Sequence, residues 1–190
     1  MLAPVNLCNI FRIQARANRL ANRRLHAALA SLTRDDFHCA RTGYFPSLAA
    51  TLNHILAVDL YYVGALQRDT GLPENYHQFA AADDLPALTE RQRVCDERLI
   101  AFCDRLDEAA CGADVLMDRG NGKVQRDLAG HVLSHLFMHQ THHRGQAHAM
   151  LSGTVVEPPQ FDEFLMPSDA PYRVADMAAL GWDEADVYAP

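Results

Sequence analysis

The chain has 190 residues, of which 49% are hydrophobic, 22% charged and 8% aromatic, and its formal net charge is −7. This length suits one domain with a substantial core, and the apolar content excludes a disordered chain. Because no apolar run reaches the ~18 residues that a membrane-spanning helix needs, no membrane partner is expected.

The first predicted helix covers residues 7–32 and is amphipathic. Leu7, Phe11, Leu25 and Leu29 recur at the helical period, and four arginines lie on the opposite side. Residues 1–34 contain six arginines and no acidic residue. We expect the arginine face to be solvated, or to dock the acidic C-terminal segment or a second subunit.

Three further helices are predicted along the chain. One covers residues 47–68, after Pro46 and before Gly71, and the next covers 86–110, between a first-turn Pro86 and Gly112. The fourth covers residues 125–151 and ends before Gly153. Between the last two, Asn121 and Gly122 separate short apolar runs over 115–124, a pattern that favours a small β-hairpin.

The segment after residue 151 is rich in proline and acidic residues. From residue 157 onward it has eight acidic residues and one arginine, and we expect it to wrap the surface with a short helix near 174–180. The sequence therefore predicts an all-α protein: a four-helix bundle over residues 1–152, with a crossover connection, and a C-terminal extension over 153–190 packed on it.

Charge and cysteine usage limit the partners and the compartment. A nucleic-acid interface needs clustered positive potential on a basic domain, so this acidic chain predicts no nucleic-acid partner. The five cysteines form no Cys-x-x-Cys pair and are odd in number, which is typical of reduced thiols and predicts a cytoplasmic protein.

Histidine is the unusual residue of this sequence, with ten in all and six between positions 131 and 148. At ~100° per residue, His139 and His143 lie within about 40° of each other, on the apolar stripe of the fourth helix. His54 faces the core from the second helix by the same arithmetic. The other histidines of the cluster lie at the edge of the stripe or, for His148, on the opposite face.

Three core-facing histidines indicate a metal site. Neutral imidazole is a common metal ligand, and spacing i, i+4 lets two rings reach one ion while a facing helix supplies the third. The string from His139 to His143 has the spacing of a zinc-peptidase helix, but Gln140 replaces the general-base glutamate. A di-iron carboxylate bundle is excluded by the absence of Glu-x-x-His repeats.

Polar amides on core-facing positions suggest a pocket. Gln14 and Asn18 lie inside the apolar stripe of the first helix, and Gln146 lies beside the predicted ligands on the fourth. We predict that these three line a polar pocket over the metal; the alternative is that neighbouring groups in the core satisfy them. Asp59, about 140° from His54, is an uncertain partner of the ligands.

Two separated motifs resemble one known family. The string His135-Leu-Phe-Met-His-Gln-Thr-His-His-Arg-Gly-Gln146 is similar to the signature helix of the DinB/YfiT-like superfamily, and Thr51-Leu-Asn-His-Ile-Leu-Ala-Val-Asp59 resembles its second-helix motif. The similarity spans about residues 10–152. It implies a crossover four-helix bundle, often a homodimer, with a divalent metal held by three histidines that map to His54, His139 and His143.

Three protein ligands leave a coordination position open, as in catalytic sites. We therefore predict a divalent-metal-binding protein that acts as a metal-dependent enzyme, of thiol S-transferase, isomerase or hydrolase type, on a small substrate. The resemblance also implies that some relatives use low-molecular-weight thiols in their reactions. The alternative is a non-catalytic, stress-associated protein with a structural metal, and three imidazoles suit zinc, nickel, iron or manganese.

Overall fold

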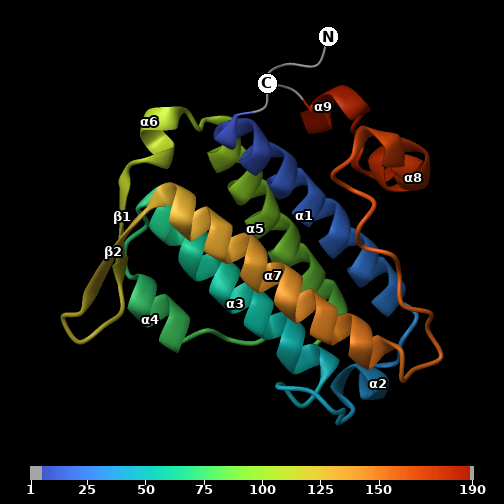
Figure 1. Cartoon of the computed structure of the whole chain (residues 1–190). Coiled ribbons are helices and arrows are strands. Elements are labelled where there is room, and N and C mark those ends of the chain that lie inside the picture. Colours follow the sequence, from blue (N-terminus) through green and yellow to red (C-terminus); the bar gives the residue numbers. More distant parts are fainter. Residues whose placement is uncertain (1–5, 189–190) are drawn as a thin grey trace.

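The computed structural model describes residues 6–188 and shows a bundle of four long helices (Figure 1). A two-stranded hairpin and several short helices surround the bundle. The long helices are α1 (Leu7–Leu29), α3 (Leu48–Gln67), α5 (Leu85–Asp104) and α7 (Ala129–Leu151). The predicted all-α bundle is confirmed.

The four long helices are not arranged in chain order. Both α1 and α3 pack against α5 and α7, so α1 and α3 lie diagonally across the bundle from each other. The chain therefore crosses the bundle between α1 and α3, and again between α5 and α7. This arrangement places α3 directly beside α7, the two helices that carry the predicted metal ligands.

Side-chain caps explain where three of these helices begin. The side chains of Asn6, Ser47 and Asp84 each accept a hydrogen bond from a backbone N–H in the first turn that follows. The predicted helix 86–110 ends earlier, at Asp104, because Asp107 caps a separate short helix. The short helices are α2 (Arg34–His38), α4 (Leu72–His77), α6 (Glu108–Cys111), α8 (Ala170–Leu180) and α9 (Glu184–Tyr188), with a 3₁₀ turn at Pro167–Asp169.

The predicted hairpin is present and is longer than expected. Strands β1 (Asp114–Asp118) and β2 (Val124–Leu128) pair antiparallel, with Asp114 opposite Leu128. The turn between them has positive φ at Gly120, Asn121 and Gly122. Since residues 124–128 satisfy their backbone groups in this ribbon, the last long helix begins at Ala129, and the predicted start at 125 is wrong.

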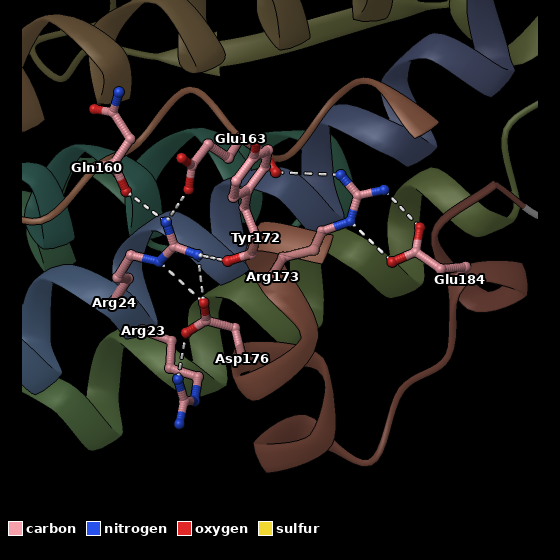
Figure 2. Close-up of polar contacts among 8 residues, drawn as sticks. All are labelled: Arg23, Arg24, Gln160, Glu163, Tyr172, Arg173, Asp176 and Glu184. Atoms are coloured by element: carbon pink, nitrogen blue, oxygen red, sulfur yellow. Dashed lines mark hydrogen bonds and ion pairs between the residues drawn. The ribbon is translucent and has the colours of Figure 1, made fainter. Parts of the chain in front are cut away.

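The acidic C-terminal segment packs along α1 through ion pairs (Figure 2). Asp176 of α8 accepts hydrogen bonds from Arg23 and Arg24, and Arg24 also pairs with Glu163. Arg173 is fully buried and pairs with Glu184. Of the four arginines on the predicted face, Arg23 docks the acidic segment, whereas Arg12 and Arg16 bond to the end of α5 and the loop after it. The docking expectation therefore holds for one end of this face only.

The core of the bundle is apolar and free of disulfides. Its largest cluster is built from leucines, valines and aromatic residues of all four long helices, and the five cysteines are free thiols. Within residues 6–188, no helix is both long and apolar enough to cross a membrane.

Candidate metal centre

Three histidine side chains converge between α3 and α7. One nitrogen from each of His54, His139 and His143 lies within 4.8 Å of the other two. The Nε2 atoms of His54 and His139 are 3.0 Å apart, and the ring centroids of His139 and His143 are separated by 4.4 Å. The structure therefore brings together the three histidines that the helical angles selected, although 85 residues separate His54 from His139.

Neighbouring side chains orient this cluster. The carbonyl oxygen Oε1 of Gln146 accepts a hydrogen bond of 2.8 Å from Nδ1 of His143, which leaves Nε2 of that ring free to bind a metal. The ring of Phe45, in the loop before α3, lies 4.4 Å from the ring of His54 and 5.6 Å from that of His143. No motif in the sequence indicates that Phe45 belongs to this site.

Burial keeps the three imidazoles neutral. Together with the smaller effect of the neighbouring His143, burial lowers the pKa of His54 to about 4 and that of His139 to about 3. Burial also lowers the pKa of His143, against the hydrogen bond that this ring donates to Gln146, which raises it. Neutral imidazole is the form that coordinates metals.

The donor set and its spacing suit a divalent first-row metal ion. Two nitrogen ligands of a tetrahedral zinc ion, each 2.0–2.1 Å from the metal, lie ~3.3 Å apart. The 3.0 Å between the Nε2 atoms of His54 and His139 is close to this value. Among the described residues, Nδ1 of His139 is buried without a hydrogen-bond partner, so packing alone orients that ring.

A cavity of about 300 Å³ adjoins His139 on the side of the hairpin. Three tyrosines line it, and the guanidinium of Arg119 lies 4.9 Å from the ring centre of Tyr61 and 5.5 Å from that of Tyr62. No sequence pattern marks Arg119, because its approach depends on how the hairpin packs against α3. The cavity wall consists of Val58, Tyr61, Tyr62, Pro73, Tyr76, His77, Asp118, Arg119, His135 and His139.

The other histidines of α7 stand apart from the cluster, as the angles predicted: His131, His135 and His142 at the edge of the stripe, and His148 on another face. His135 contacts the ring of Tyr62, at 5.2 Å, and lines the same cavity as His139. His142 accepts a hydrogen bond of 3.2 Å from the amide of Gln146. His148 packs on Phe161 of the C-terminal segment.

Gln14 and Asn18 do not lie over the three clustered histidines, so the predicted pocket position is wrong for both. Together with Arg144 they line a separate cavity of about 260 Å³ beneath the segment 161–165, and none of the three clustered histidines lines it. Helical angles place both residues on the inner side of α1, but they do not specify which neighbour an inner residue meets. Of the three predicted pocket residues, Gln146 alone contacts a clustered histidine.

Asp59 and Asn18 belong to a buried polar network at the centre of the bundle. Asp96 accepts hydrogen bonds from Asn18, Asn22 and Gln92, and Gln92 also donates to Asp59. Arg144 donates to the side-chain oxygens of Asn18 and Asn22. All four long helices contribute to this network, whose members are Asn18, Asn22, Asp59, Gln92, Asp96 and Arg144.

Removing the Gln146 side chain (Gln146→Ala) is expected to lower Zn²⁺ affinity about 10- to 100-fold. This is the range for losing a hydrogen bond that orients a ligand histidine. Competition with a colorimetric chelator measures the affinity. Ser152→Ala, which removes a hydroxyl bonded to the backbone at the end of the same helix, is the control, and equal affinities of the two variants would contradict the role of Gln146.

Asp59→Asn tests the electrostatics of the buried network. Burial, and to a smaller extent repulsion by Asp96, raises the pKa of Asp59 from 3.8 to about 7. Folding therefore favours the protonated acid, and its contribution to stability is full below pH 4 and is lost as the pH rises through 7. Relative to the variant, we expect the wild-type free energy of unfolding to fall by ~2–4 kcal/mol between pH 4 and 8.

Urea unfolding of both proteins, treated with chelator, measures this difference at each pH. The titrating histidines are common to both proteins, so their contributions cancel. A difference that stays constant across the range would show that Asp59 keeps an ordinary pKa in the folded protein.

Comparison with known proteins gives one family and one relative. The sequence model of the DinB family matches residues 10–174. This range continues past the end of α7 into α8, further than the motifs suggested. Protein DinB of Bacillus subtilis (strain 168) is 22% identical over 139 residues, which cover 70% of this chain and 80% of that protein.

Proposed function

The chain belongs to the DinB family, and we propose that His54, His139 and His143 bind one divalent metal ion. The observation that carries this proposal is the convergence of three neutral imidazole nitrogens within 4.8 Å. No carboxylate or thiolate joins this group within residues 6–188, which favours a borderline metal such as zinc, nickel, iron or manganese over magnesium or calcium.

The finer part of the proposal is that the protein is a metal-dependent enzyme for a small thiol or an electrophile. A metal with three protein ligands can lower the pKa of a bound water or thiol. The cavity beside His139 supports catalysis, because a substrate could reach the cluster through it. There Arg119 offers a positive charge, and the tyrosines offer flat apolar walls.

A structural metal is the second candidate, and the position of Phe45 favours it. Its ring packs against those of His54 and His143, which limits access to these two imidazoles, and it does not line the cavity beside His139. A metal that only joins α3 to α7 would need no cavity beside it. Homodimerisation, cytoplasmic location and the absence of a nucleic-acid partner stay predictions.

Cobalt substitution tests these two candidates. The protein is stripped with chelator, loaded with Co²⁺, and titrated with cysteine as the low-molecular-weight thiol. An exchangeable position predicts a new thiolate-to-cobalt charge-transfer band that saturates at one thiol per chain. Stoichiometric cobalt with no spectral response to cysteine would support the structural role, and failure to bind cobalt would contradict the metal site itself.

A further inference from the structure

A cavity of about 620 Å³ lies away from the three clustered histidines. It is bounded by the C-terminal half of α1, by α2 and the N-terminal turns of α5, and by the end of α8. None of the clustered histidines lines it. Its size falls in the range of small-molecule sites, ~300–1,000 Å³.

One cationic and one polar side chain face this cavity without a hydrogen-bond or ion-pair partner among the described residues. Arg19 is 8% exposed and His26 is 6% exposed, and both lie on one face of α1. Neither side chain makes a hydrogen bond or ion pair with any residue from 6 to 188. The other arginines of α1 all have partners on α5, on the loop after it or on the C-terminal segment.

The guanidinium of Arg19 borders the cavity and has no direct counterion. Burial lowers the pKa of Arg19, and the nearby Asp96 opposes that effect. The oxygens of Asp96, however, already accept hydrogen bonds from the amides of Asn22 and Gln92. Arg19 therefore keeps free donors that an anion inside the cavity could satisfy.

The other charges of the cavity wall limit the ligand to a single negative charge. Arg23 pairs with Asp176, Arg34 with Asp83, and Glu90 with Arg93. Asp84 caps the first turn of α5. Arg19 is thus the cation that remains without direct compensation on the described wall.

The rest of the wall is mainly apolar. Leu29, Leu32, Phe37, Leu85 and Leu180 contribute to it. The pair between Arg23 and Asp176 fixes α8, so that Ala179 and Leu180 complete the wall (Figure 2). We propose that this cavity binds a small organic carboxylate with an apolar body, whose carboxylate pairs with Arg19 while His26 offers a further hydrogen bond.

Titration calorimetry with decanoate tests this site in the full chain. The protein is first treated with chelator, so that the carboxylate cannot bind a metal at the histidine cluster. We expect saturable binding of one decanoate per chain, and at least ~10-fold weaker binding of uncharged decanol. Absence of decanoate binding, or equal binding of decanol, would overturn the proposal.

Substitutions in the cavity wall test whether decanoate binds in this cavity. Arg19→Gln should weaken decanoate binding at least ~10-fold, and Arg19→Lys should retain part of it. Arg16→Gln, one turn earlier and outside the cavity, is the matched control and should bind like wild type. Ala27→Trp, at an exposed position on the cavity wall, should abolish binding without disturbing the core. Wild-type affinity in Arg19→Gln or Ala27→Trp would contradict the site.

Discussion

Replacing one clustered histidine (His139→Ala) is expected to lower the Zn²⁺ affinity at least ~100-fold and to leave the purified protein without stoichiometric metal. Removing a partner that only orients a ligand costs 10- to 100-fold, and removing the ligand itself should cost more. His139 contacts both other histidines: its Nε2 lies 3.0 Å from that of His54, and its ring centre lies 4.4 Å from that of His143. Its loss leaves two imidazoles, which cannot hold the metal against a competing chelator.

Elemental analysis of purified protein and chelator competition measure this effect. His54→Ala should behave in the same way although it lies on another helix, because the site requires both. His148→Ala is the matched control, since this histidine packs on Phe161 away from the cluster. Full metal occupancy in His139→Ala, or equal losses in all three variants, would contradict the assignment.

The histidine cluster could be found from the sequence because helix geometry is regular. A histidine on an apolar stripe must face the core, and His139 and His143, spaced i, i+4, must lie on one face. The third ligand came from the same argument applied to another helix. Pairing His54 with them also needed α3 to lie beside α7, which the family motifs implied and helical angles alone could not supply.

Other parts of the site depend on contacts that no local pattern encodes. Asn18 does face inward, but it bonds to Arg144 and Asp96, and Gln14 lines a cavity with Arg144 rather than with the histidines. Arg119 reaches the metal side through the packing of the hairpin. The start of α7 was placed too early because Val124–Leu128 pairs with a strand, and pairing between segments is decided by tertiary structure.

The buried network accounts for the register of the helices that form the metal centre. Arg144 directly follows His143 on α7, and Asp59 lies on α3 five residues after His54. Rotating or sliding either helix would break hydrogen bonds that reach α1 and α5. The polar contacts at the centre of the bundle therefore fix the faces that α3 and α7 present to each other.

Arg144→Met is accordingly expected to lower the free energy of unfolding by ~3–5 kcal/mol, the usual cost of removing one partner from a buried charge network. Arg144 is 8% exposed, and Asp59 and Asp96 are each 1% exposed. The variant keeps an unbranched apolar stem but leaves two buried acids without their cation. At ~2–4 °C per kcal/mol for a chain of this size, the melting temperature should fall by ~6–20 °C.

The pH dependence and a second substitution separate this mechanism from a packing defect. Burial raises the pKa of Asp96 to about 6, so protonation relieves the unpaired acids, and the loss in Arg144→Met should be smaller at pH 5 than at pH 8. Adding Asp96→Asn should restore at least ~1 kcal/mol at pH 8, because it removes a buried charge and keeps an acceptor. Arg16→Met, on an exposed pair with Asp104, should cost at most ~1 kcal/mol. A loss that is independent of pH and unaffected by Asp96→Asn would assign the effect of Arg144 to its volume and not to its charge.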